Sequence, residues 1–317
     1  MNETIRDRIR GIIVGAAVGD ALGMPLEFGS AAPVERMIRT MRSGRLPAGS
    51  FTDDTEMALA LSESLLHNFR LDGDDLVQRF AAWYRSNPPD VGIHTANVLQ
   101  RVSRGEPWQQ VVKEVQLAHP HNAGNGSLMR CYPVAAACWN DLDALVEQSC
   151  LQSQVTHPHE DCQAACVFVN AMIFHLIHAS PPRQAYQQAL DQSQPGHGQT
   201  ELPEGLRTAV LLAPRRKREE LRNTGWVRHT LESAVWGLLT TDSFEDALVQ
   251  VINLGADTDT TGAVTGALAG AAYGLKAIPP DWKNALRGEY PLKTGKIWRL
   301  DDFINLADQL AAKSAIA

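Results

Sequence analysis

The chain has 317 residues, of which 44% are hydrophobic and 6% aromatic, so it is long enough to bury a large core. Its 29 basic and 36 acidic residues give a formal net charge of −7. This charge argues against nucleic acid as a partner, because a nucleic-acid-binding surface is usually a clustered basic field. No Pro/Ser-rich linker or charge run divides the sequence, which therefore predicts a single domain over residues 1–317.

The cysteines and the N-terminus predict the compartment. Five cysteines form an odd number without a paired framework or a metal-type spacing, which indicates a reducing environment. Three arginines before the apolar stretch 11–18 imitate a secretory signal, but Glu3 and Asp7 dilute the basic part and Asp20 interrupts the apolar part. The sequence shows no run of about twenty apolar residues that could span a bilayer. We therefore expect a soluble, cytoplasmic protein with no membrane span.

Helical periodicity dominates the chain from end to end, with Pro, Gly, Asn and Asp clusters as turns between the periodic segments. Alternating, strand-like segments are almost absent. The sequence therefore predicts the all-α class, a compact array of helices with functional loops at one end. One helix is expected around the glycines from Gly11 to Gly23, one directly after Asp54, and one from Leu76 to Tyr84. Further helices are expected at 92–103, 127–138, 160–178, 183–192, 204–221, 227–239, 244–254, 260–274 and 303–313.

Two predicted helices carry glycine at every fourth residue: Gly11, Gly15, Gly19 and Gly23 in one, and Gly262, Gly266, Gly270 and Gly274 in the other. In an exposed helix each glycine would cost about 1 kcal/mol relative to alanine. The close approach of another backbone is a reason to have glycine there. We expect these two helices to pack tightly and to bring the residues before the second one towards the N-terminal part of the chain.

Two short acidic motifs lie far apart in the sequence, Thr52-Asp53-Asp54 and Asp257-Thr258-Asp259-Thr260. Each alone could be a helix N-cap beside a solvated carboxylate. Together they supply four carboxylates and several hydroxyls, the hard oxygen ligands that Mg²⁺ and Mn²⁺ prefer. The set can hold two metal ions if the motifs meet in space.

A glycine-rich segment, Asn122-Ala123-Gly124-Asn125-Gly126-Ser127, lies between the acidic motifs. Glycines before an apolar helix leave backbone N–H groups free at a helix N-terminus, where phosphate binds readily. The segment has neither the lysine of a P-loop nor the preceding strand of a dinucleotide fold. A glycine turn capped by serine is the alternative interpretation.

With these motifs, the chain resembles the ADP-ribosylglycohydrolase family, close to its dinitrogenase-reductase-activating branch. The resemblance extends from Gly11 to Tyr273. It rests on six motifs in the same order: Gly19-Asp20-Ala21-Leu22-Gly23 with Glu27, Phe51-Thr52-Asp53-Asp54-Thr55, Asp90-Val91-Gly92, Gly124-Asn125-Gly126-Ser127-Leu128-Met129-Arg130, Thr156-His157, and Gly255-Ala256-Asp257-Thr258-Asp259-Thr260.

The resemblance implies an orthogonal all-α fold with a binuclear Mg²⁺ or Mn²⁺ centre that hydrolyses the bond between ADP-ribose and a modified residue. It assigns the metal to Thr52, Asp53, Asp54, Asp257, Asp259 and Thr260. It places the diphosphate at the segment from Gly124 to Ser127, with Asn122 and Asn125, and it places His157 at the ADP-ribose. His94 and His159 are expected to face solvent or to pack.

Asp90, Gly92 and Thr95 match the substrate loop of the arginine-directed branch, where the Asp90 carboxylate would engage the guanidinium. Asp90 follows two prolines and could instead be a helix cap, as Glu27 could be a surface carboxylate and His157 a turn residue. Trp226 matches an aromatic of that branch that is commonly tyrosine. The change keeps a stacking surface but removes a hydroxyl, which puts a proton-transfer role there in doubt.

The mechanism that the resemblance implies depends on the positive charge of the two metal ions. Two metal ions roughly 3.5–4 Å apart can orient the ribose hydroxyls and lower the pKa of a bound water. Asp54, Asp90 and Glu27 are the candidate catalytic carboxylates that would handle protons. Direct attack by water and a route through an opened ribose ring both remain open.

Three functions are compatible with these residues. The first is removal of ADP-ribose from arginine on an ADP-ribosylated protein, with ADP-ribose as the product. The second is hydrolysis of serine-linked or small-molecule ADP-ribose conjugates, and the third is a catalytically silent ADP-ribose-binding protein. The intact acidic set argues against the third. The sequence names neither the target protein nor a regulatory protein partner.

Overall fold

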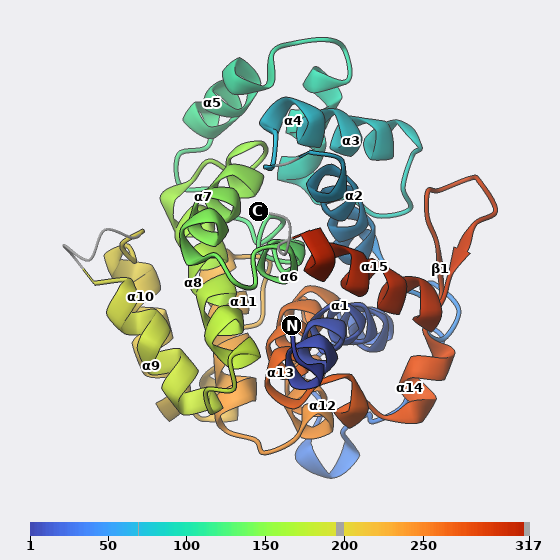
Figure 1. Ribbon diagram of the computed structural model, residues 1–317, viewed down its shortest axis with the longest axis vertical. Helices are drawn as coiled ribbons and strands as arrows, with labels where there is room; N and C mark the ends of the chain where they lie inside the picture. Colours follow the sequence, from blue (N-terminus) through green and yellow to red (C-terminus); the bar gives the residue numbers. More distant parts are fainter. Residues whose placement is uncertain (69, 195–199, 314–317) are drawn as a thin grey trace.

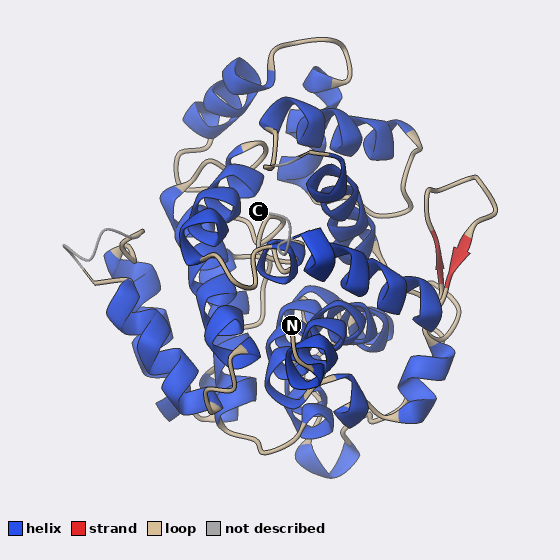
Figure 2. Cartoon of the chain, viewed as in Figure 1, coloured by secondary structure: helices blue, strands red, loops and turns tan. Residues whose placement is uncertain are grey.

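The computed structural model describes residues 1–68, 70–194 and 200–313, and it confirms the all-α class (Figures 1 and 2). The longer helices are, in chain order, α1 (Glu3–Gly23), α2 (Asp53–His67), α3 (Gly73–Arg85), α4 (Ile93–Val102), α5 (Trp108–Ala118), α6 (Pro133–Ala137), α7 (Leu142–Gln154), α8 (Glu160–Ile177), α9 (Pro182–Gln192), α10 (Glu204–Leu212), α11 (Val227–Leu239), α12 (Phe244–Ile252), α13 (Thr258–Tyr273), α14 (Pro280–Ala285) and α15 (Leu300–Lys313). One two-residue antiparallel pair, β1 (Gly288–Glu289) with β2 (Ile297–Trp298), is the sheet of the described residues.

Helices α1 and α13 lie side by side at the centre of the molecule and run in opposite directions (Figure 1). Their glycines face each other: a Cβ placed on Gly15 or on Gly266 would overlap the backbone of the other helix, and Gly19 and Gly262 are related in the same way. The expected packing of the two glycine helices is therefore confirmed. The contact fixes the end of α1 next to the start of α13, which is where the two acidic motifs meet.

Helices α1 and α8 are long and apolar enough, by length and composition alone, to qualify as membrane spans. The sequence predicts that no segment is long and apolar enough to span a bilayer, and by length and composition this prediction is wrong for these two helices. However, 83% of the most apolar 18-residue stretch within Glu3–Leu26, which is α1 with the short turn after it, lies buried inside the protein, and so does 78% of that in α8. Packing in the core accounts for their apolar character, and the dense glycine and alanine content of α1 suits its close contact with α13.

Proline explains two places where the predicted helices differ from the structure. The segment predicted as helix at 127–138 is helical only from Pro133, because proline has no N–H to donate and is favoured in the first turn of a helix. The helix predicted at 204–221 ends at Leu212, and a short 3-10 turn that contains Pro214 follows. Helices α5 and α7 were not predicted at all.

Four helices begin at the same place in the molecule. The residues just before or at the start of α2, α4, α11 and α13 (Asp53, Gly92, Gly225 and Asp257) all line one cavity. A helix N-terminus carries the positive end of the helix dipole, so this convergence favours anionic groups, both carboxylates of the protein and phosphates of a ligand. The fold thus builds the site from loops at one end of the helices, as expected.

Candidate active site

A cavity of about 860 Å³ gathers most of the residues that the sequence singled out. This volume is in the range of small-molecule sites. The predicted residues that line it are Glu27, Asp53, Asp54, Asp90, Gly92, Thr95, Asn122, Gly124, Asn125, Gly126, His157, Asp257, Asp259 and Thr260. Residues from both acidic motifs, the glycine-rich segment and the substrate loop therefore share one space.

Three predicted site residues do not line the cavity. Thr52 is buried behind it, with its hydroxyl 3.1 Å from Asp54 Oδ2. Ser127 is fully buried, and its Oγ accepts a hydrogen bond from the Ser153 hydroxyl at 2.8 Å, so its side chain points into the protein interior. Trp226 lies outside, 38% exposed, with its ring 4.9 Å from the Arg228 guanidinium carbon. Ser127 can therefore offer only its backbone to a ligand at this segment.

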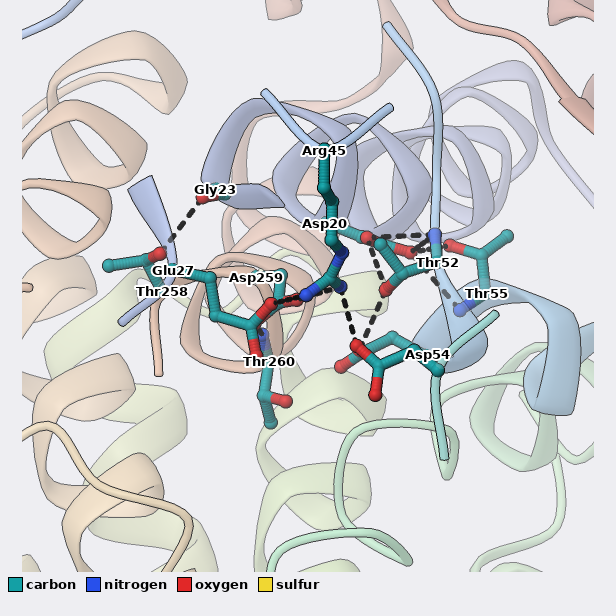
Figure 3. Close-up of polar contacts among 11 residues, drawn as sticks. Asp20, Gly23, Glu27, Arg45, Thr52, Asp54, Thr55, Thr258, Asp259 and Thr260 are labelled. Carbon is teal, nitrogen blue, oxygen red and sulfur yellow. Dashed lines mark hydrogen bonds and ion pairs between the residues drawn. The ribbon is translucent and has the colours of Figure 1, made fainter. Parts of the chain in front are cut away.

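Asp20, near the end of α1, holds the first acidic motif in place (Figure 3). Its fully buried carboxylate accepts hydrogen bonds from the backbone N–H and hydroxyl of Thr52, each at 2.9 Å, and from the Thr55 hydroxyl at 2.6 Å. Asp20 belongs to the first of the six motifs, but its role in holding Thr52 and Thr55 is not predicted from the sequence. Its signal in the sequence was a lone carboxylate inside an apolar helix.

The carboxylates of the two acidic motifs and Asp20 form a cluster whose negative charges repel one another. Burial first, and then the charges of Asp20 and Asp53, raise the pKa of Asp54 well above its usual value. Burial and the charges of Asp54 and Asp257 raise the pKa of Asp259 in the same way. One buried oxygen, Asp54 Oδ1, has no hydrogen-bond partner among the described residues. Such a cluster is stabilised by protons or by cations.

The donor set fits a hard divalent cation in its chemistry, because it is made of carboxylates and hydroxyls and one of its buried oxygens has no partner. In the described residues no three Asp, Glu, His or Cys side chains converge closely enough to enclose an ion. The cluster therefore has the right ligand types but is not closed around a single point in this conformation.

An arginine of the protein itself reaches into the cluster (Figure 3). The Arg45 guanidinium pairs with the Glu27 carboxylate, with Asp90 Oδ2 at 2.6 Å and with Asp259 Oδ2 at 3.4 Å. Sequence reasoning missed Arg45, which lies in an irregular loop before Ser50 and belongs to no motif. Arg45 supplies the positive charge that partly offsets Glu27, Asp90 and Asp259.

The glycine-rich segment is tied to the second acidic motif. Asn125 donates through Nδ2 to Asp257 Oδ2 at 2.9 Å and to the Thr230 hydroxyl at 2.8 Å, and its backbone N–H donates to the Gly225 carbonyl at 3.0 Å. These bonds hold the segment against the starts of α11 and α13. The predicted phosphate-binding segment and the predicted metal ligand Asp257 therefore form one wall of the cavity.

Two histidines, His94 and His157, line the cavity beside the glycine-rich segment. The rings of His94 and His157 lie 4.7 Å apart, and both side chains are buried. His94 does not face solvent: its Nε2 lies 2.9 Å from the Thr156 carbonyl, and its Nδ1 lies 3.1 Å from Asn122 Nδ2. Burial lowers the pKa of both histidines, so both are neutral near pH 7. His159 caps the N-terminus of α8.

Comparison with known proteins agrees with this geometry. The ADP-ribosylglycohydrolase family model matches residues 1–316. Two relatives are an ADP-ribosylarginine hydrolase Tri1 of Serratia proteamaculans, 32% identical with 96% of this chain and 79% of the relative covered, and the ADP-ribosyl-[dinitrogen reductase] glycohydrolase of Rhodospirillum rubrum, 34% identical with 89% and 91% covered. A solved structure, an ADP-ribosylglycohydrolase-related protein complex, superimposes with a TM-score of 0.79 at 32% identity and covers 99% of this chain and 100% of its own.

The acid-lined cavity, the glycine-rich segment and the helical frame thus define a glycohydrolase. The chain belongs to the ADP-ribosylglycohydrolase family.

Proposed function

We propose that this protein removes ADP-ribose from ADP-ribosylated arginine on a protein and releases free ADP-ribose. The observation that carries this proposal is the position of Arg45, because a guanidinium already lies between the carboxylates of Glu27 and Asp90 at the edge of the cavity. A carboxylate pair that binds one guanidinium has the charge and fork geometry to bind another. The name of one relative, ADP-ribosylarginine hydrolase, supports the arginine linkage, and the name of the other, ADP-ribosyl-[dinitrogen reductase] glycohydrolase, supports a protein substrate.

We further propose that two Mg²⁺ or Mn²⁺ ions bind at this site, held by Thr52, Asp53, Asp54, Asp257, Asp259 and Thr260. The unpartnered Asp54 Oδ1 and the raised pKa values of Asp54 and Asp259, which burial and like charges cause, support a cation there. When bound, such ions would polarise the ribose and acidify a water.

The residues of the chain itself would then share the remaining work. The backbone N–H groups of Gly124, Gly126 and Ser127 and the side-chain amide of Asn122 would bind the diphosphate. Gly124, Gly126 and Asn122 line the cavity, and the Asn125 N–H already donates to the Gly225 carbonyl. Asp90 would bind the guanidinium at the leaving side. Burial raises the pKa of Glu27, and this carboxyl group would exchange a proton with the departing guanidine.

The test is release of free ADP-ribose from an arginine-ADP-ribosylated protein, with Mg²⁺ or Mn²⁺ and again with EDTA, beside a serine-ADP-ribosylated protein. Metal-dependent release from arginine alone supports the proposal. Release from serine alone would move the function to the second class of hydrolase. ADP-ribose binding without release from either substrate would identify a silent binding protein.

We also propose a cytoplasmic location. All five cysteines are free thiols, and four of them are buried, as expected for a protein in a reducing compartment. Localisation of the tagged protein by cell fractionation would test this.

A further inference from the structure

A fully buried arginine is linked to one of the two histidines of the cavity, His157, through the Thr156 hydroxyl. Arg130 has no exposed surface, and its guanidinium carbon lies 4.2 Å from the centre of the Phe80 ring. Its donors bond to the Gln152 side chain and carbonyl, to Met57 and to Thr156, and no carboxylate pairs with it among the described residues. A buried charge without a counter-ion is costly, so its hydrogen bonds have to be well directed.

The direction of two hydrogen bonds follows from this arginine. Arg130 can only donate, so the Thr156 oxygen, 2.7 Å from the guanidinium, accepts. The same oxygen lies 2.8 Å from Nδ1 of His157. Thr156 is fully buried, and Nδ1 of His157 is the one acceptor for its hydroxyl proton among its bonds within the described residues. If Nδ1 carried a proton instead, that hydroxyl proton would be left without a partner.

His157 is therefore held in one tautomer. With Nδ1 as acceptor and the ring neutral, the proton is on Nε2. This nitrogen faces the glycine-rich segment: a Cβ on Gly126 would lie 3.1 Å from Nε2 and 2.9 Å from Cε1, and a Cβ on Gly124 would lie 3.6 Å from Nε2. His157 lines the cavity, and its Nε2 has no acceptor within the part of the chain that the structure describes.

We propose that Arg130 and Thr156 are positioning residues that fix His157 as a neutral Nε2–H donor aimed at the ligand, at the place where the glycine-rich segment binds the diphosphate. Arg130 orients the Thr156 hydroxyl, and that hydroxyl selects the tautomer. The ligand gains a donor that is already oriented and bears no charge. The proposal rests on the proposed function for the identity of the ligand, ADP-ribose, but not for the tautomer.

His94 supplies an internal control for the test. Its Nε2 lies 2.9 Å from a carbonyl oxygen, that of Thr156, which can only accept, so His94 also carries its proton on Nε2. This bond uses the backbone of Thr156 and not its side chain. A substitution of the Thr156 side chain should thus leave the tautomer of His94 unchanged while it releases that of His157.

The experiment is ¹⁵N NMR of the histidine rings, without metal or ligand, in the wild type, Thr156→Val and Thr156→Ser. We expect His157 to be Nε2-protonated in the wild type and in Thr156→Ser, and to become a mixture of tautomers in Thr156→Val, with His94 unchanged in all three. Calorimetry with ADP-ribose should show about 3–10-fold weaker binding for Thr156→Val and near wild-type binding for Thr156→Ser, since one neutral hydrogen bond is lost for part of the population.

Two results would overturn the proposal. One is Nδ1-protonated His157 in the wild type, a measurement that does not depend on any variant folding. The other is a Thr156→Val protein whose His157 keeps a single Nε2–H tautomer, whether or not its affinity falls. A wild type that does not bind ADP-ribose, but shows the expected tautomers, would instead count against the proposed function.

Discussion

Gly19 of α1 and Gly262 of α13 contact each other backbone to backbone, and a Cβ on either would overlap the carbonyl group of the other. This contact is one of a series that runs from Gly11 with Gly270 to Gly23 with Thr258. Asp20 follows Gly19 directly, and Asp259 lies three residues before Gly262. The spacing between the two helix axes therefore determines how close the two acidic motifs come.

Gly266→Ala tests this contact, because the contact decides whether the substitution raises or lowers the free energy of unfolding. In an open helix alanine would stabilise the protein by about 1 kcal/mol relative to glycine. Here the added Cβ would lie 2.7 Å from the Gly15 carbonyl carbon, so the helices must move apart, and we expect the free energy of unfolding to fall by about 1–3 kcal/mol. Urea denaturation followed by circular dichroism measures it. An equal or more stable variant would show that the helices do not depend on this contact.

The α1–α13 packing could be predicted from the sequence because its cause is periodic. Glycine at every fourth residue is a pattern that a single chain displays, and it has a physical reason. The hydrogen bond from Thr52 to Asp20 leaves no such pattern, because it joins single residues of two segments that meet only when the chain folds. The acidic residues themselves were found by their chemistry, but the residue that orients them was not.

Asp54→Asn should separate metal binding from folding. The amide keeps the shape of the carboxylate and removes one charge from the cluster whose repulsion, with burial, raises the pKa of Asp54. We expect the melting temperature without metal to be unchanged or higher, the increase in melting temperature on adding Mn²⁺ to be largely lost, and turnover to fall on the order of 100-fold or more. Differential scanning calorimetry with EDTA and with Mn²⁺ measures the first two.

The matched control is Asp143→Asn, which changes the same chemical group at an exposed position in the first turn of α7. It should keep both the Mn²⁺-dependent increase in melting temperature and the turnover. If Asp54→Asn also keeps the full increase, Asp54 is not a metal ligand.

Glu56 makes the stability of the metal-free protein depend on pH. Burial raises the pKa of its carboxyl to about 7, and Oε2 accepts from Trp83 Nε1 at 2.6 Å. The folded-state pKa of Glu56 is above the unfolded value. Its contribution to the free energy of unfolding is therefore fully present below about pH 4.5 and is lost as the pH rises through about 7. In the wild type we expect the free energy of unfolding to fall by about 2–3 kcal/mol between pH 4.5 and 8 because of Glu56, and in Glu56→Gln we expect this fall to be absent. Urea titrations with EDTA at the two pH values measure the difference.

In that comparison the two proteins should have similar stability at pH 4.5, and the variant should be the more stable at pH 8. Glu147→Gln, at an exposed ion pair with Arg70, serves as the control and should follow the wild type at both pH values. Parallel pH curves for Glu56→Gln and the wild type would show that Glu56 titrates normally.

Arg45 shows why part of the site was beyond sequence reasoning. Its loop between Met37 and Ser50 is largely irregular, has no periodicity and matches no motif, and its role depends on where the loop folds back. Glu27 and Asp90 were found because their neighbours form motifs, yet their common partner was not. The glycine-rich segment shows the opposite case: the sequence located it, but its serine faces the interior.

Arg45→Gln should change the affinity of the site for a cation. The guanidinium lies 3.4 Å from Asp259 Oδ2 and pairs with Glu27 and Asp90, so it competes with a metal ion for the same negative charge. Its side chain is 33% exposed, and solvent screening reduces the effect to about 1 kcal/mol. We therefore expect about 3–10-fold tighter Mn²⁺ binding in calorimetry, and no change for Arg42→Gln in the same loop. Weaker binding in Arg45→Gln would mean that the arginine holds the carboxylates in place for the metal instead of competing with it.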